Sequence, residues 1–527
     1  MNGSVVATGN PFTIASTTNG AHVGALEKGY FAIYDTFNIT SFPDPVAVIN
    51  QGDSAFFAMG DSVQLTTTAQ NGVAYEWFKG FDEDWRFIGP RGFSPGATNK
   101  TRAQVGPDGT IYAAFQDEAN GDGISVMRYD GIAWQFVGSP GFSAGAVGDI
   151  DFKIAPDSTL YVAFEDKFTG GSGSNGKATV MYFDGAAWQT LGTTEFSAGG
   201  LIHISLEISQ QDTVYVGYTD IANLNRGTVQ RFNGTAWENV GPAGFTAGFA
   251  GPVDLGIAPD GTLYFGFGDI TSGPATTVMT FDGTNWQILG TPGFSDQSDG
   301  SRTTSIAFDP AGVPYVGAVG GDNPFFVEVF RFDGNDWAQL DTALVNGSNP
   351  SYNAVAINPT GTVYTSSVFG TNSANRAPTV WQLTGSGWQP VGNPNFVFSQ
   401  AIEGSLDFGV DGNPIYIFRD NRLLNGIGNR ATAMRFGPEY LVNGTDVFAS
   451  DTGNYILVAA NSQGCTARDT IRVEQTIAQA LLASAAVDSN ASCNSFSDGG
   501  VTTTAIGGTT PYTYNWSNSA TTASITG

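Results

Sequence analysis

Four aspartates occupy one position of a segment that recurs along this sequence. Each follows a tyrosine by five residues, where an apolar run gives way to a loop; the four are Asp117, Asp166, Asp220 and Asp269. If the recurring segments close into a ring, these carboxylates would gather at one end of it. There they would bind calcium, which prefers oxygen ligands, or a polyhydroxylated ligand. These aspartates are therefore the candidate ligand-binding residues, with calcium as the candidate metal.

The alternative for these aspartates is that each carboxylate caps its own loop by accepting backbone N–H hydrogen bonds. Repetition favours the alternative, because a binding site is usually built once per ring. The later repeats place other residues at this position, which we assign as Gly320, Phe369 and Asn421. A ring of aspartates would therefore be incomplete.

The sequence contains few features that are typical of a catalytic site. The only histidines are His22 and His203, and no nucleophile elbow, glycine-rich phosphate loop or zinc-ligand spacing occurs. A fold can bring together two carboxyl groups for glycoside hydrolysis without a local motif, so a glycan-cleaving enzyme stays an alternative. We predict that the chain is not an enzyme and has no catalytic residues.

Seven tryptophans mark the repeat that must position the aspartates. They recur about every fifty residues, a period that is typical of β-propellers; they are Trp85, Trp134, Trp188, Trp237, Trp286, Trp337 and Trp388. Each follows a tight turn and precedes an apolar run, in what we predict to be the outer strand of a blade. This placement favours packing between neighbouring blades over a stacking platform for sugars.

Composition supports an all-β protein with an acidic surface. The chain has 527 residues, 70 of them glycine, only 13% charged residues and a net charge of −27. No window shows the apolar spacing of a helix, and no run of eighteen apolar residues could span a membrane. The negative charge argues against nucleic acid or an anionic membrane as partner.

The strand pattern predicts a seven-bladed propeller over residues 81–436. The strand around Trp85 has no inner strands before it, and residues 431–436 have no outer strand after them. We predict that these two segments pair and close the ring, which removes an exposed sheet edge. An eighth blade that uses the segment after residue 436 is the alternative.

The flanks of this block resemble two halves of one bacterial immunoglobulin-like domain. Residues 45–80 alternate apolar and polar side chains around Trp77, and 437–475 contain the pattern DTGNYILVAANSQGCTARDTIRV. The resemblance implies a sandwich in which the tryptophan packs between two sheets. The propeller would then be inserted into the sandwich, as insertions are tolerated where chain ends lie close together. Residues 1–44 are an unassigned lead-in.

Residues 483–527 resemble the start of an SprB-type repeat of bacterial gliding-motility adhesins. The similarity lies in Cys493, in Ser497-Asp498-Gly499, in Pro511-Tyr512 and in Trp516-Ser517. The resemblance implies a truncated C-terminal β domain, a partner for Cys493 beyond residue 527, and a secreted, cell-surface protein. Cys465 is left unpaired. No signal peptide is visible at the start of the sequence.

Loop variation suggests where a ligand would bind. The PDGT and FDG turns barely change between repeats, whereas the loops between second and third strands differ in every copy. The sequence therefore predicts a non-catalytic extracellular adhesion module that recognises a glycan or a surface protein through the variable loops. A structural spacer in a large surface fibre is the second hypothesis, and the glycan-cleaving enzyme is the third.

Overall fold

The computed structural model describes residues 24–27, 30–33, 45–58, 62–79, 85–167, 176–273, 275–295, 304–320, 326–341, 351–369, 377–397, 401–421, 428–437, 439–450, 453–461, 466–476, 482–493, 497–506 and 511–526. Within these ranges the protein is all-β. They contain no α-helix, only two short 3₁₀ turns, Glu118–Asn120 and Ile221–Asn223. No helix in the described part of the chain has the length and apolar character needed to cross a membrane.

Seven antiparallel sheets of four strands make up the largest part of the molecule. In six of them the strands follow one another in sequence, from an inner to an outer strand. These are β7–β10 (Thr98–Val105, Ile111–Asp117, Gly123–Tyr129, Trp134–Phe136), β11–β14 (Val147–Ile154, Leu160–Asp166, Lys177–Phe183, Trp188–Thr190), β15–β18 (Leu201–Ile208, Val214–Asp220, Arg226–Phe232, Trp237–Asn239), β19–β22 (Ala250–Ile257, Leu263–Asp269, Ala275–Phe281, Trp286–Ile288), β23–β26 (Thr304–Phe308, Pro314–Gly320, Phe326–Phe332, Trp337–Gln339) and β27–β30 (Ser351–Ile357, Val363–Phe369, Ala377–Thr384, Gly387–Pro390).

The seventh sheet draws its strands from two distant parts of the sequence. It consists of β31 (Ala401–Phe408), β32 (Pro414–Asp420), β33 (Arg430–Phe436) and β6 (Trp85–Phe87). Phe436 pairs with Trp85 across its outer edge. The inner strands contact one another in the order β7, β11, β15, β19, β23, β27, β31 and back to β7. Repeated four-stranded sheets in this arrangement are the blades of a β-propeller.

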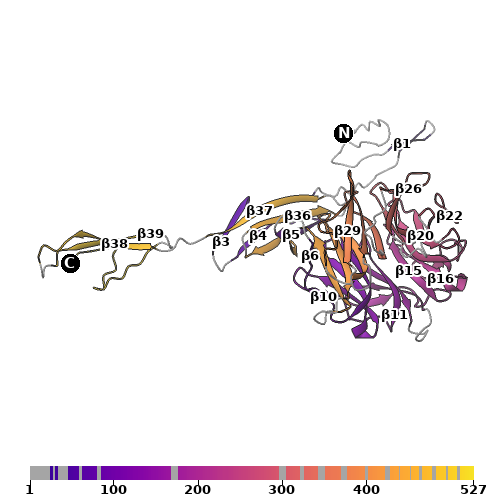
Figure 1. Ribbon diagram of the computed structural model, residues 1–527, viewed down its shortest axis with the longest axis horizontal. Helices are drawn as coiled ribbons and strands as arrows, with labels where there is room; N and C mark the ends of the chain where they lie inside the picture. The colour runs from indigo at the N-terminus through magenta and orange to yellow at the C-terminus, as the bar shows by residue number, and fades with distance from the viewer. Residues whose placement is uncertain are drawn as a thin grey trace.

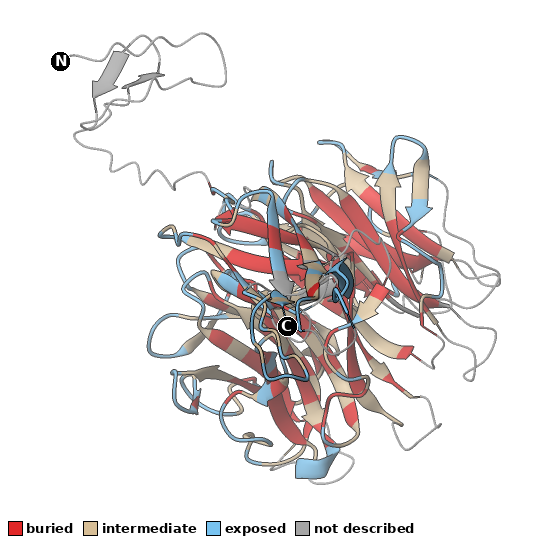
Figure 2. Cartoon of the chain, turned by 90° about the vertical axis from the view of Figure 1, so that its left-hand side faces the viewer, coloured by how far each residue is buried: buried red, intermediate tan, exposed pale blue. Residues whose placement is uncertain are grey.

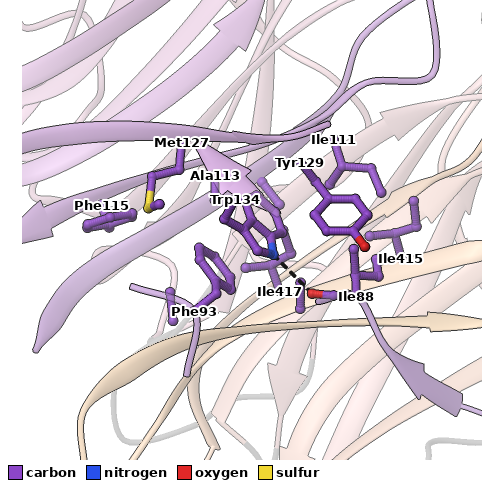
Figure 3. Close-up of a cluster of buried hydrophobic side chains, with 13 residues drawn as sticks. Ile88, Phe93, Ile111, Ala113, Phe115, Met127, Tyr129, Trp134, Ile415 and Ile417 are labelled. Carbon is purple, nitrogen blue, oxygen red and sulfur yellow. Dashed lines mark hydrogen bonds between the residues drawn. The ribbon is translucent and has the colours of Figure 1, made fainter. Parts of the chain in front are cut away.

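The repeated tryptophans tie each sheet to the one before it. Trp134 stacks on Phe93 with ring centroids 3.9 Å apart, and its Nε1 donates to the Ile88 carbonyl oxygen at 2.9 Å (Figure 3). All seven indoles make the equivalent hydrogen bond; the acceptors for the other six are Val137, Leu191, Val240, Leu289, Leu340 and Val391. The bond from Trp85 to Val391 completes the cycle, so the indoles are part of the packing between sheets.

A second body is built from strands that precede the ring in the sequence and strands that follow it. Its larger sheet has the order β3 (Ser54–Ala58), β37 (Thr466–Thr476), β36 (Gly453–Asn461), β5 (Val73–Lys79) and β34 (Glu439–Asn443). Strands β4 (Val63–Thr66) and β35 (Asp446–Ala449) pair separately. The core between them includes Trp77, Leu65 and Leu457, each fully buried. Figure 1 shows this body beside the ring.

Turns of the ring lie against this second body. Val410, in the turn between β31 and β32, packs on Phe78, Ile456 and Val458. Arg435 of β33 is 2% exposed, and its guanidinium carbon lies 4.3 Å from the centroid of the Phe78 ring. The two bodies therefore share a buried interface at the end of the ring that carries the short turns.

A small three-stranded sheet extends away from the ring at the C-terminal end (Figure 1). It consists of β38 (Leu482–Ser489), β39 (Gly500–Ile506) and β40 (Ser524–Thr526). Every residue of β38 is exposed, in contrast to the buried strands of the ring (Figure 2). A separate hairpin, β1 (Gly24–Glu27) and β2 (Tyr30–Ile33), lies in the N-terminal segment.

Candidate ligand-binding cavity

The repeated aspartates lie at the ends of second strands and are buried. Asp117 accepts hydrogen bonds from the Ala119 N–H at 3.1 Å, from Asn120 Nδ2 at 2.8 Å and from Ser125 Oγ at 2.6 Å. Asp220 is bound in the same way by Ala222, Asn223 and Thr228. These contacts have the geometry of a loop cap, in which the carboxylate orders its own loop.

The other two aspartates share this environment. Asp269 accepts bonds from Thr271, Ser272 and Thr277. Burial by itself would raise the pKa of Asp269, but these hydrogen bonds to the charged form lower it below its usual value. Asp166 accepts a bond from Thr179 Oγ1 at 3.2 Å, and much of the loop that follows it lies outside the described residues.

The repeated position of the last blade is also an aspartate, Asp420, and its assignment to Asn421 from the sequence was wrong by one residue. Asp420 pairs with Ala401 just as Asp117 pairs with Thr98, so Asp420 and not Asn421 occupies the repeated position. Its carboxylate forms an ion pair with Arg91 at 2.6 Å. The strand alignment could not be fixed from the tyrosine spacing, because Tyr416 is shifted by one residue relative to Tyr112.

The described residues contain no group of three or more His, Cys, Asp or Glu side chains that could hold a metal ion. The candidate aspartates lie in different blades, and Asp117, Asp220 and Asp269 are each bound by their own loops. His22 and Cys465 fall outside the described residues. Cys493 is exposed and forms no disulfide with any residue that the structure describes.

A different set of residues surrounds a cavity of about 320 Å³ at the centre of the ring. All seven inner strands contribute to its wall: Lys100 and Arg102 from β7, Asp149 and Asp151 from β11, His203 to Ser205 from β15, Pro252 to Asp254 from β19, Thr304 and Ser305 from β23, Asn353 from β27, and Glu403 and Gly404 from β31. These residues lie within the first five residues of the inner strands. That is the end of the ring where the variable loops lie, since Val147 at the start of β11 pairs with Asp166.

Backbone irregularities direct several of these side chains. Six inner strands shift register near the cavity, at Asn99/Arg102, Val147/Ile150, Ile202/Ile204, Ala250/Val253, Ser351/Ala354 and Ile402/Ser405. At three of these bulges a residue other than glycine has a left-handed backbone: Lys100 (φ 53°), His203 (φ 55°) and Glu403 (φ 57°). Such conformations cost on the order of 1–3 kcal/mol each and cluster at functional sites.

Most of the cavity carboxylates also join neighbouring blades. Asp151 accepts the Leu206 N–H at 2.8 Å, and Asp254 accepts the Ile306 N–H at 2.7 Å and Ser205 Oγ at 3.1 Å. Asp149 accepts the Ile204 N–H at 3.3 Å. These bonds link adjacent inner strands and fix the position of each carboxylate.

The pKa values of Asp149 and Asp254, two of the carboxyl groups beside β15, are shifted in opposite directions. Burial would raise the pKa of Asp149, but the nearby charges of Lys100 and Arg102 hold it below its usual value. Burial raises the pKa of Asp254 to about 7, and the positive charge of Lys153 opposes that rise only in part. Burial lowers the pKa of His203, while the Asp149 carboxylate counteracts the effect.

None of these cavity residues was predicted as a site from the sequence. They differ from blade to blade, so no repeat pattern marks them. The available signal was the presence of charged residues at one inner-strand position, such as Lys100 and Asp149, where another repeat carries Pro252.

The comparisons with known proteins found likeness only among solved structures. No family model matches the sequence, and no curated protein matches it. An α-L-arabinanase of Penicillium chrysogenum in complex with arabinobiose is 14% identical, with a TM-score of 0.36, over 55% of this chain and 93% of that one. A PL25 ulvan lyase bound to a GlcA–Rha3S saccharide is 10% identical, with a TM-score of 0.43, over 67% and 97%. An α-L-arabinofuranosidase of Fusarium graminearum with an iminosugar inhibitor is 15% identical, with a TM-score of 0.36, over 55% and 93%.

These neighbours overturn one prediction from the sequence. The chain was predicted not to be an enzyme, whereas the arabinanase, the lyase and the arabinofuranosidase are enzymes. The prediction was wrong because it relied on local motifs. A ring can assemble its reacting groups from strands that lie far apart in the sequence.

Proposed function

We propose that this chain is a carbohydrate-binding protein whose ligand occupies the central cavity of a seven-bladed propeller. The observation that carries the proposal is the cavity itself. Its volume of about 320 Å³ falls in the range of small-molecule sites, and charged, hydroxyl and amide side chains converge on it from every blade. Such groups hydrogen-bond to the hydroxyls of a sugar.

The rest of the chain supports a surface role for this binding. We propose that the second body is an immunoglobulin-like sandwich into which the ring is inserted, supported by the pairing of β5 with β36 and by the buried Trp77. The sandwich contacts the ends of the inner strands, at turns such as the one that carries Val410, whereas the cavity residues lie toward the starts of these strands. Together with the resemblance of residues 483–527 to an adhesin repeat, this arrangement favours an extracellular protein that presents the cavity outward.

A glycan array probed with the full chain tests the proposal. The array is run with calcium and with chelator, and then with His203→Asn, because asparagine tolerates the left-handed backbone at that position. Asp212→Asn is the matched control: Asp212 also has a positive φ (58°), but it lies in a turn outside the cavity. Weaker binding by His203→Asn alone supports the proposal. Equal binding by both variants and the wild type would place the ligand elsewhere, and silence on the array would refute carbohydrate binding.

Glycan cleavage is a second candidate function, favoured by Asp149 and Asp254. They contact consecutive residues of β15, Ile204 and Ser205, and environments that push two carboxyl pKa values apart are typical of an acid and base pair. Asp254 would supply the proton to the leaving group, and ionised Asp149 would act as base or nucleophile.

A reducing-end assay on a glycan that binds tests cleavage. Asp254→Asn should abolish release of new reducing ends while binding persists. Binding without turnover in the wild type would exclude cleavage of that glycan.

A further inference from the structure

The wall of the central cavity is polarised, and its two sides differ in the chemistry they offer. Strands β7 and β15 carry the cationic or imidazole side chains Lys100, Arg102 and His203. Strand β11 lies between them and carries Asp149 and Asp151. The opposite side, from β19 to β27, presents Pro252, Thr304 and Asn353, together with Asp254, whose two carboxylate oxygens already accept hydrogen bonds within the protein. A ligand that matches both sides has one anionic end near Arg102 and one hydroxyl-bearing end.

On the charged side of the cavity, the groups that can still form hydrogen bonds are donors. Arg102 Nη2 lies 3.9 Å from Asp149 Oδ1, and Arg102 Nε lies 3.7 Å from Asp151 Oδ1. Both distances exceed a hydrogen bond, so these N–H groups are electrostatically paired but still open to an acceptor. His203 makes no hydrogen bond within the part of the chain that the structure describes.

The carboxylates of the same wall are largely occupied. Asp151 accepts two backbone N–H groups, from Leu206 at 2.8 Å and Phe152 at 2.9 Å. Asp254 uses both oxygens within the protein, and Glu403 accepts the Lys100 N–H. Most of these carboxylate oxygens already accept a hydrogen bond, whereas Arg102 Nε and Nη2 donate none within hydrogen-bond distance, so the cavity favours the acceptor atoms of a ligand.

The backbone supports the same conclusion. Lys100 and His203 occupy equivalent bulge positions in β7 and β15, and both have left-handed conformations. Lys100 Nζ lies 3.4 Å from Asp149 Oδ1, so Asp149 holds the ammonium group beside Arg102. Two of the three left-handed bulge residues place donors at the cavity, and the third, Glu403, accepts the Lys100 N–H; strained positions of this kind indicate a preorganised site.

We propose that the cavity binds an acidic sugar, whose carboxylate or sulfate is held by Arg102, Lys100 and His203 while its hydroxyls face the hydroxyl and amide side chains of β23 and β27. This inference rests on the proposed carbohydrate binding and specifies its ligand class. A guanidinium donating two parallel bonds to an anionic group is the contact that the open Nε and Nη2 can make.

Calorimetry with matched acidic and neutral sugars tests the inference. The probes are oligogalacturonate and its methyl ester, and a sulfated galactan oligosaccharide and its desulfated form. The wild-type chain should bind at least one acidic member tenfold or more tightly than its neutral counterpart. Arg102→Gln and Lys100→Asn should each remove most of that preference, while Arg472→Gln, an exposed arginine of β37, should keep it.

The outcomes separate the two proposals. Equal affinity for both members of each pair would overturn the acidic-sugar assignment and leave carbohydrate binding intact. Binding to none of these probes, while neutral glycans bind elsewhere on an array, would also overturn it. An acidic preference that survives both cavity substitutions would place the anion site outside the cavity, and failure of every glycan to bind would refute the proposed function itself.

Discussion

Replacing Glu76 with glutamine should change how the stability of the second body depends on pH. Glu76 of β5 is fully buried at the interface with the ring. Its Oε2 lies 3.2 Å from Arg435 Nη2, and the same Nη2 lies 2.6 Å from Asp411 Oδ1. Burial raises the pKa of Glu76 from 4.5 to about 7; the Arg435 charge opposes that rise and the Asp411 charge adds to it.

The sign and size of the effect follow from that pKa. The folded protein holds the Glu76 proton more tightly than the unfolded chain does. The stabilisation is therefore complete below pH 4.5 and is lost as the pH rises through 7. A rise of the Glu76 pKa from 4.5 to about 7 corresponds to about 3 kcal/mol in the free energy of unfolding. Glutamine keeps the shape and does not titrate, so the wild-type free energy minus that of Glu76→Gln should fall by about this amount between pH 4.5 and 8.

Urea-dependent hydrogen exchange is the assay, since a chain with several bodies does not unfold in one step. Opening free energies are read from peptides covering 73–79 and 453–461 at each pH, after correction for intrinsic exchange. Glu474→Gln is the control, because Glu474 is an exposed glutamate of the same sheet. The reasoning would be refuted if the opening free energy of the wild type minus that of Glu76→Gln stayed constant or rose with pH.

Three further predictions concern the ring. Trp286→Ala should cost about 3–5 kcal/mol by leaving a cavity between blades, whereas Trp286→Phe should cost less; equal losses in thermal unfolding would contradict a packing role. Asp117→Ala should cost about 0.5–2 kcal/mol and speed hydrogen exchange in 118–122, because it removes a loop cap; unchanged exchange there would contradict the cap. Chelator should leave the melting temperature of the wild type unchanged, since internal hydrogen bonds already occupy the repeated aspartates, and a drop of several degrees would instead indicate a bound metal.

The repeats made much of the ring predictable from sequence. A glycine-containing turn, an apolar run and a tryptophan recur because each blade needs the same hairpins and the same contact with the blade before it. Trp134 and Trp286 could therefore be assigned to blade packing from their spacing. The position of Asp420 could not, because a shift of one residue in a strand is visible only when its partner strand is known.

The candidate site residues also differed in whether they could be recognised as repeats. The aspartates attracted attention because they repeat, and Asp117 and Asp220 prove to be bound within their own loops. The cavity residues do not repeat. A binding site is formed once at the centre of a ring, so its chemistry resides in the positions where the blades differ.

The sequence by itself determined the all-β character, the period of the blades and the tryptophans that join them, since these follow from local strand and turn preferences applied repeatedly. Tertiary structure alone decided which charged groups meet. Lys100, Asp149 and His203 lie about fifty residues apart in sequence, as expected for one position in successive blades. They share one cavity only because the ring closes and their strands bulge toward its centre. Ring closure is a long-range event, and no local pattern encodes the contacts that it creates.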